Sequence, residues 1–97
     1  MIRVLIERHL KKDNEPEYHK AIRKLKQKAS HRDGYLSGEM LIDPEDSSHC
    51  LILSNWQDLE SWKVWNKSTE RKTARDTIRK MLTKDENILI FQSTSMK

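Results

Sequence analysis

Residues that cross-link a chain or interrupt regular structure are scarce in this sequence. Its 97 residues include two glycines, two prolines and one cysteine. The single cysteine, Cys50, excludes an intrachain disulfide and fits a reducing compartment, so we expect a cytoplasmic protein. Because Cys50 has apolar neighbours and no evident activating partner, we expect a small buried hydrophobe rather than a nucleophile.

Long hydrophobic runs and metal-ligand motifs are missing too. No stretch of 18 apolar residues occurs, and nothing after Met1 resembles a signal peptide. No glycine-rich phosphate loop is present. The histidines are scattered, and no pair has metal-site spacing along one helix or strand: His9, His19, His31 and His49. We therefore expect no membrane association and no metal site.

Acidic residues are fewer than basic ones. Against 15 Asp and Glu there are 19 Lys and Arg, which gives a net charge of +4. Much of the excess lies between His19 and Arg32, where a nucleic-acid surface is one interpretation. No aromatic residue is interleaved there to stack on bases, so the solvated face of an amphipathic helix is favoured. We expect no nucleic-acid partner.

The first third of the chain has a strand pattern followed by a helix pattern. In residues 2–10, Ile2, Val4 and Ile6 share one strand face and Leu5 lies on the other. The spacing of Asn14 and Glu17 resembles a capping box, with Pro16 in the first helical turn. The apolar stripe of this helix consists of Tyr18, Ala21, Ile22, Leu25 and Ala29. Gly34 suits the left-handed conformation of a chain reversal.

Two strands, two short helices and a final strand are predicted after Gly34. Residues 35–43 alternate, with one face formed by Leu36, Met40 and Ile42, and the turn formers of residues 43–48 lead to a strand at 49–56. Asp58 and Ser68 are placed to cap two helices. The second of these helices has a buried stripe of Ala74, Ile78, Met81 and Leu82. Residues 88–91 form a last strand, and the tail from Ser93 to Lys97 is expected to fray.

This order of elements predicts an α+β, ferredoxin-like fold with a split β-α-β plan. Its four-stranded antiparallel sheet would have helices on one face, and residues 1–97 would form a single domain. Strands covered on one side should alternate apolar and polar residues. The first, third and fourth strands instead leave apolar residues on the uncovered face: Leu5, Leu51, Leu53, Leu89 and Phe91. We therefore expect a homodimer that packs sheet against sheet.

Three segments resemble the antibiotic biosynthesis monooxygenase (ABM) family: GYLSGE at 34–39, SNWQDLESWKVW at 54–65 and NKSTERK at 66–72. The likeness extends over roughly residues 2–91. It implies a dimeric α+β barrel, in agreement with the expectation from the strands. Some members of this family are monooxygenases of aromatic polyketides that need no cofactor, others degrade haem, and many have no assigned activity.

The resemblance also implies pocket positions between the sheet and the helices. Trp65 matches the family's helical tryptophan. The family's asparagine on the first strand falls on Arg8, or on Glu7 if the register is shifted by one. Arg75 occupies the position of the iron-ligating histidine of haem degraders, and arginine has no lone pair to offer iron. This departure disfavours haem degradation.

The candidate site residues are Arg8, Trp65 and Arg75, each with a structural alternative. Arg8 lies on the face expected to meet the helices, where it needs either a carboxylate partner or an anionic ligand. Trp56 and Trp62 are expected to be core, whereas Trp65 would both pack and form a pocket wall. Arg75 alternatively lies on the solvated side of its helix. If Arg8 and Arg75 converge, they form a pocket for a small acidic molecule.

Three functions remain open at this point. The first is an ABM-type oxygenase of a small aromatic or conjugated molecule, acting without a metal or organic cofactor. Arg8 and Arg75 would then stabilise the developing anion in a dry pocket walled by Trp65. The second is a binding or stress-related dimeric barrel without catalytic activity. The third is a haem-degrading enzyme. Fold class does not decide among them, because function depends on the site.

Overall fold

The computed structural model describes residues 1–94 of the chain. The elements are β1 (Ile2–His9), α1 (Glu15–Ala29), β2 (Tyr35–Asp43), β3 (Asp46–Trp56), α2 (Leu59–Asn66), α3 (Thr69–Arg79) and β4 (Asn87–Gln92). The four strands form one antiparallel sheet in the order β2-β3-β1-β4. The predicted α+β, ferredoxin-like fold is confirmed. The prediction that the tail frays lies, from residue 95 on, outside the described residues.

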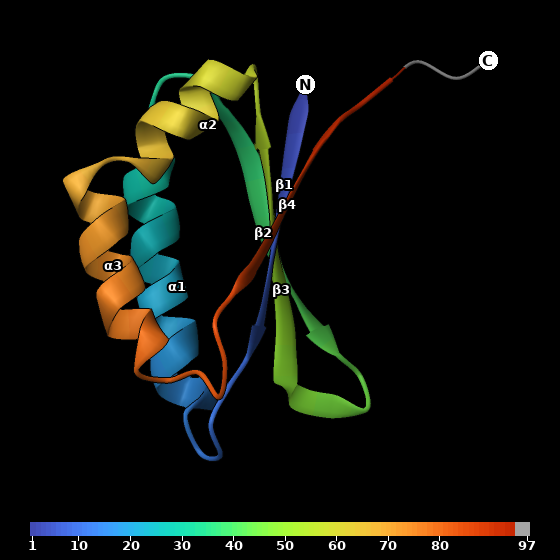
Figure 1. The fold of residues 1–97 in the computed structure, drawn as a ribbon, viewed down its shortest axis with the longest axis vertical. Helices are drawn as coiled ribbons and strands as arrows, with labels where there is room; N and C mark the ends of the chain where they lie inside the picture. Colours follow the sequence, from blue (N-terminus) through green and yellow to red (C-terminus); the bar gives the residue numbers. More distant parts are fainter. Residues whose placement is uncertain (95–97) are drawn as a thin grey trace.

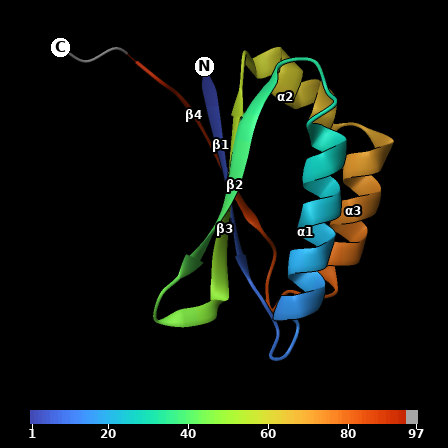
Figure 2. The ribbon, with the colours of Figure 1, turned by 180° about the vertical axis from the view of Figure 1, so that it is seen from behind.

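All three helices lie on one side of the sheet, which is seen nearly edge-on in Figure 1 and from behind in Figure 2. We call the side toward the helices the inner face and the opposite side the outer face. Ile2, Val4, Ile6 and Arg8 point to the inner face and are all at least nine-tenths buried. Each pairs with an inner-face residue of β3, as in the Ile2–Trp56 pair. This confirms the face assigned to β1 from its alternation.

Two adjoining apolar clusters fill the space between the inner face and the helices. One contains Val4, Trp56, Trp62 and Trp65, and the other contains residues of α1 and α3 together with Leu10, Cys50 and Leu82. Cys50 is 3% exposed, as expected for a small buried hydrophobe. The helix stripes predicted from 3.6-residue spacing therefore face the sheet. The prediction was wrong for Met81 and Leu82, which pack against the second cluster from the connector after α3, because α3 ends at Arg79.

Helix ends agree with two of the three predicted caps. Asp58 accepts a hydrogen bond from the Ser61 amide at 2.8 Å, and Ser68 accepts one from the Arg71 amide at 3.1 Å. The predicted capping box at Asn14 is wrong. Asn14 is the N-cap of α1, but its side-chain amide donates to the Lys12 carbonyl instead of accepting from the helix. The neighbouring turn, where Asp13 has φ of 67°, holds the Asn14 side chain away from the helix.

The strand boundaries differ from prediction at the β2–β3 hairpin. β3 begins at Asp46, three residues before the predicted start at His49, because Asp46 already pairs with Asp43 across a tight turn. A bulge between Tyr35 and Ser37 changes the face of Leu36, which is 52% exposed. Tyr35, not Leu36, therefore shares the inner face with Met40, because a bulge inserts one unpaired residue and shifts the alternation.

The outer face carries a group of apolar side chains contributed by β1, β3 and β4. Leu5 lies opposite Leu53 on one side and Leu89 on the other. Leu89 and Phe91 are 43% and 57% exposed. Among residues 1–94, no helix or strand covers this face (Figures 1 and 2). The apolar outer face predicted from the strand pattern is thus present in the fold.

Candidate functional site

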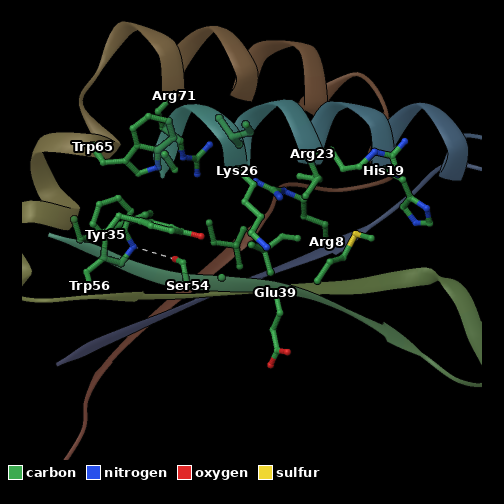
Figure 3. A pocket seen from close by; sticks show the side chains of 18 residues that line it. Arg8, His19, Arg23, Lys26, Tyr35, Glu39, Ser54, Trp56, Trp65 and Arg71 are labelled. Carbon is green, nitrogen blue, oxygen red and sulfur yellow. Dashed lines mark hydrogen bonds between the residues drawn. The ribbon is translucent and has the colours of Figure 1, made fainter. Parts of the chain in front are cut away.

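A cavity of about 200 Å³ lies between the inner face and α1. Figure 3 shows its lining, with α1 on one side and strands β2, β3 and β1 on the other. Trp56, Trp65 and Tyr35 lie toward one end, and Arg8 and His19 lie toward the other. The cavity therefore has an aromatic end and a more polar end.

The aromatic end is built by the three tryptophans and Tyr35. Trp56 lies at the centre, with ring-centroid distances of 6.0 Å to Trp62 and 6.4 Å to Trp65. Tyr35 meets Trp56 edge-to-face at 5.3 Å. The Trp56 indole is also fixed by donating a hydrogen bond to Ser54 Oγ at 3.0 Å. Because each ring is packed by its neighbours, this wall is preorganised for a flat ligand.

A buried ion network lies beside the cavity. Arg8 donates to Glu86 Oε1 through Nε at 3.0 Å and through Nη2 at 2.8 Å, and its Nη1 donates to the Tyr18 hydroxyl at 3.0 Å. Arg71 Nη2 donates to Glu86 Oε2 at 2.9 Å. Arg8 and Arg71 are each 1% exposed. One carboxylate therefore links two buried guanidinium groups.

The pKa values of this network agree with the geometry. Burial acts to raise the pKa of Glu86, but the charges and hydrogen bonds of Arg8 and Arg71 outweigh it and lower the pKa. Burial raises the pKa of the Tyr18 phenol despite its contact with Arg8. Burial lowers the pKa of Arg71, although an arginine remains protonated in any case. The network thus carries two positive charges and one negative charge.

Three buried polar atoms at the cavity have no hydrogen-bond partner. They are Arg71 Nη1, the Tyr35 hydroxyl and His19 Nε2, and all three residues belong to the lining. A buried donor without a partner costs about 1–3 kcal/mol. The one acidic residue of the lining, Glu39, points its carboxylate away from the cavity (Figure 3). Arg71 and Tyr35 therefore offer donors, and Arg71 offers positive charge, so a ligand group that satisfies them must be an acceptor, preferably an anion.

The three predicted site residues are placed differently from one another. Arg8 and Trp65 are buried and line the cavity. Arg75 is not among the lining residues. Its side chain is 27% exposed, its Nη2 donates to Asn66 Oδ1 at 2.8 Å, and its Nε lies 3.9 Å from Glu86 Oε2. Arg8 and Arg75 thus converge on Glu86, but a different arginine, Arg71, reaches the cavity. Trp56 and Trp62, expected to be core only, also line it.

Sequence reasoning missed Arg71 and Glu86. A signal for Arg71 was available, because it lies three residues before Ala74 and seven before Ile78, on the buried stripe of α3. No comparable signal existed for Glu86. It belongs to the irregular connector between α3 and β4, where no periodicity assigns a side chain to the interior.

None of the helices in the described chain has the length and apolar character needed to cross a membrane.

The fold has counterparts among solved structures. One crystal structure of an antibiotic biosynthesis monooxygenase is 15% identical, with a TM-score of 0.88 over 98% of this chain and 100% of that one. A conserved protein from Methanosarcina mazei Go1 is 19% identical, with a TM-score of 0.90 over 96% and 92%. SnoaB, a cofactor-independent oxygenase from Streptomyces nogalater, is 8% identical, with a TM-score of 0.88 over 98% and 94%. At these identities the likeness is one of fold.

A search of curated protein sequences gives no match. The family model described as antibiotic biosynthesis monooxygenase matches residues 1–77, which include β1, the tryptophan-rich segment and Arg71. The chain therefore belongs to the antibiotic biosynthesis monooxygenase family.

Proposed function

We propose that the chain is a small-molecule oxygenase whose substrate is an electron-rich aromatic acid. The observation that carries the proposal is Arg71 Nη1, a buried guanidinium nitrogen without a partner at a cavity walled by tryptophans. A carboxylate on the substrate would accept charge-assisted hydrogen bonds from this group. Its ring would lie against the indoles. Membership of a family of monooxygenases supports oxygen chemistry rather than another reaction.

The cavity volume limits the size of the substrate. A cavity of about 150 Å³ is sufficient for benzene. The cavity of about 200 Å³ therefore suits a substituted single ring or two fused rings.

A haem is several times larger and does not fit this cavity. Arg75, the residue at the position of the family's iron-ligating histidine, has no lone pair and does not line the cavity.

The reaction that fits such a substrate is conversion of a hydroxyaromatic ring to a quinone. For a naphthol, the C–H bond para to the hydroxyl breaks and a C=O bond forms with one atom of dioxygen. The other oxygen atom leaves as water, together with the ring hydrogen and the hydroxyl hydrogen. The substrate supplies all four electrons that reduce dioxygen, so the balance needs no further reductant.

The lining residues have distinct roles in this scheme. His19 Nε2 is buried without a partner and would accept the hydroxyl proton of the substrate. Arg71 would hold the carboxylate and stabilise the anion. Arg8 would act as a positioning residue. Its guanidinium already donates hydrogen bonds to Glu86 and Tyr18, and it holds the Glu86 carboxylate in place beside Arg71. The tryptophans would exclude water from the reacting ring.

Calorimetric titration with hydroxynaphthoic acids and with uncharged naphthol tests the binding step. We expect the acids to bind more tightly than naphthol, and Arg71→Gln to weaken acid binding at least tenfold while leaving naphthol binding little changed. Arg75→Gln is the matched control, because it removes an arginine one helical turn away that does not reach the cavity. Equal losses in the two variants would contradict a carboxylate contact at Arg71.

Oxygen consumption and quinone absorbance with the same compounds test the chemical step. We expect uptake by the wild type and a large loss in His19→Gln and Trp65→Ala. A binding protein without catalysis is the second candidate, favoured by the lack of a carboxylate base among the described lining residues. Tight binding of the acids with no oxygen uptake above the buffer rate would establish that candidate and reject the oxygenase.

We also propose that the protein functions as a homodimer through its outer face. The support is a group of apolar side chains on the outer face, in which Leu89 and Phe91 of β4 are exposed and three leucines of β1 and β3 are half-buried: Leu5, Leu51 and Leu53. Leaving them in water forgoes about 25 cal/mol for each Å² of apolar surface. A second copy offers the same apolar face, which makes a self-complementary contact about a two-fold axis.

A further inference from the structure

A group of metal-ligating side chains lies on the outer face, on the opposite side of the sheet from the cavity. Glu7 and His9 are two residues apart on β1 and therefore point to the same side. His49 lies directly opposite His9 on β3. Arg8, between Glu7 and His9, points the other way into the core, so this group is separate from the site proposed above.

The donor atoms of the three residues are close together. One ligand atom from each of Glu7, His9 and His49 lies within 4.8 Å of the other two. His49 Nε2 is 2.7 Å from Glu7 Oε2, and the two imidazole rings are stacked with centroids 4.5 Å apart. Two ligands of a tetrahedral zinc ion are about 3.3 Å apart for bonds of about 2.0–2.1 Å. To reach that spacing around one ion, the two imidazole rings would rotate out of their stacked arrangement, because a ring nitrogen binds a metal in the plane of its ring.

A second carboxylate fixes the orientation of His49. Its Nδ1 lies 3.0 Å from Asp43 Oδ2, an atom of β2. With Nδ1 engaged, Nε2 is the nitrogen directed at Glu7. This is the carboxylate–histidine arrangement that orients imidazole ligands around bound metals. Asp43 and Glu7 together give the group two negative charges, which favour a divalent cation.

We propose that Glu7, His9 and His49 form a binding site for a divalent transition-metal ion, with Asp43 orienting His49. Two imidazoles and one carboxylate suit Zn²⁺ better than Ca²⁺ or Mg²⁺, which prefer oxygen ligands. The three side chains are half-buried in the single chain, which leaves the fourth coordination position open to water there. This proposal departs from the expectation of no metal site, which rested on spacing along one element, because the two histidines are 40 residues apart and meet only across two strands.

Calorimetric titration of the full chain with ZnCl₂, and visible absorption after addition of CoCl₂, test the site. We expect saturable binding of one zinc ion per chain and cobalt bands typical of mixed nitrogen and oxygen ligands. His9→Gln and His49→Gln should each abolish saturable binding, and Asp43→Asn should weaken it about 10–100-fold. His31→Gln is the matched control, since His31 is exposed and lies outside the group, and it should bind like the wild type.

Two results would overturn the proposal. One is the absence of saturable zinc binding by the wild type at concentrations well above those of the protein. The other is zinc binding that His9→Gln and His49→Gln leave unchanged while both variants remain folded by circular dichroism. Neither result depends on oxygenase activity, so the metal site and the proposed function are tested separately.

Discussion

Glu86 is the residue on which the buried charges of the molecule depend. Its two carboxylate oxygens accept hydrogen bonds from Arg8 and Arg71, and Arg75 approaches within 3.9 Å. A buried pair of this kind contributes little net stability when intact, because desolvation opposes the attraction. Removal of one partner lowers the stability of the fold, since it leaves a charge buried without a counter-charge.

Glu86→Gln should therefore destabilise the fold by about 3–5 kcal/mol, as measured by urea unfolding followed by circular dichroism. The matched control is Glu70→Gln. Glu70 also pairs with an arginine, Arg32, but its side chain is 44% exposed. Exposed pairs contribute about 1 kcal/mol or less. Similar losses in the two variants would show that Glu86 does not act as a buried counter-ion.

The lowered pKa of Glu86 also predicts how this contribution depends on pH. A carboxyl group whose pKa is lower in the folded state stabilises the fold above its unfolded pKa of about 4.3. That stabilisation is lost as the pH falls through the folded pKa. The difference in unfolding free energy between the wild type and Glu86→Gln should thus narrow from pH 6 toward pH 3. Denaturant titrations at several pH values provide the test, and a constant difference would count against it.

Individual site residues were predictable where they lay on a periodic pattern. Arg8 was placed on the buried face of β1 by alternation, and Trp65 was identified through the resemblance. The resemblance to the family points to Arg75, whereas the apolar stripe of α3 points to Arg71, the arginine that lines the cavity. Glu86 was out of reach, because a charged residue in a connector becomes buried through tertiary structure alone.

At the level of elements, two glycines position the walls of the cavity. Gly34 has φ of 85° in the turn between α1 and β2, and a Cβ there would lie 2.1 Å from Ser61 Oγ in α2. A Cβ on Gly38 in β2 would lie 2.5 Å from the Tyr35 hydroxyl. The first site allows α2 to pack closely on the turn, and the second makes room for a side chain that lines the cavity.

Gly34→Ala and Gly38→Ala should have different effects. Gly34→Ala should cost about 1–3 kcal/mol from backbone strain alone, with the Ser61 clash adding to it. Gly38→Ala meets the far end of a side chain that can move, so it should alter ligand binding more than stability. Thermal unfolding and calorimetry with a hydroxynaphthoic acid measure the two effects. Equal destabilisation with unchanged binding would disprove this distinction.

The type and order of the elements followed from the sequence, but some of their ends did not. Asp58 and Ser68 were recognisable as caps because a polar side chain precedes each apolar stripe. Asn14 had the same appearance, yet its side chain bonds backward to Lys12. The bulge at Leu36 could not be predicted, because it arises from the pairing of β2 with β3 and not from either strand alone.

On the scale of the whole molecule, the exposed outer face predicts self-association. Phe91→Lys together with Leu89→Lys should convert a dimer to a monomer, because each places a charge in the apolar contact that the dimer would bury. Sedimentation equilibrium measures the change. Val64→Lys is the control, since Val64 is 52% exposed on α2 and lies away from the sheet's outer face. A wild-type monomer at micromolar concentration would refute the dimer.

The clustering of all three tryptophans at the cavity has a practical consequence. Trp62 and Trp65 both pack against Trp56, and these are the three tryptophans of the protein. The intrinsic tryptophan fluorescence therefore comes from a single place. Excitation energy absorbed by any one ring passes readily to the others at such separations. The tryptophan emission therefore reports on the wall of the cavity. Quenching of this emission by a quinone would show that the quinone has bound in the cavity, without any added dye.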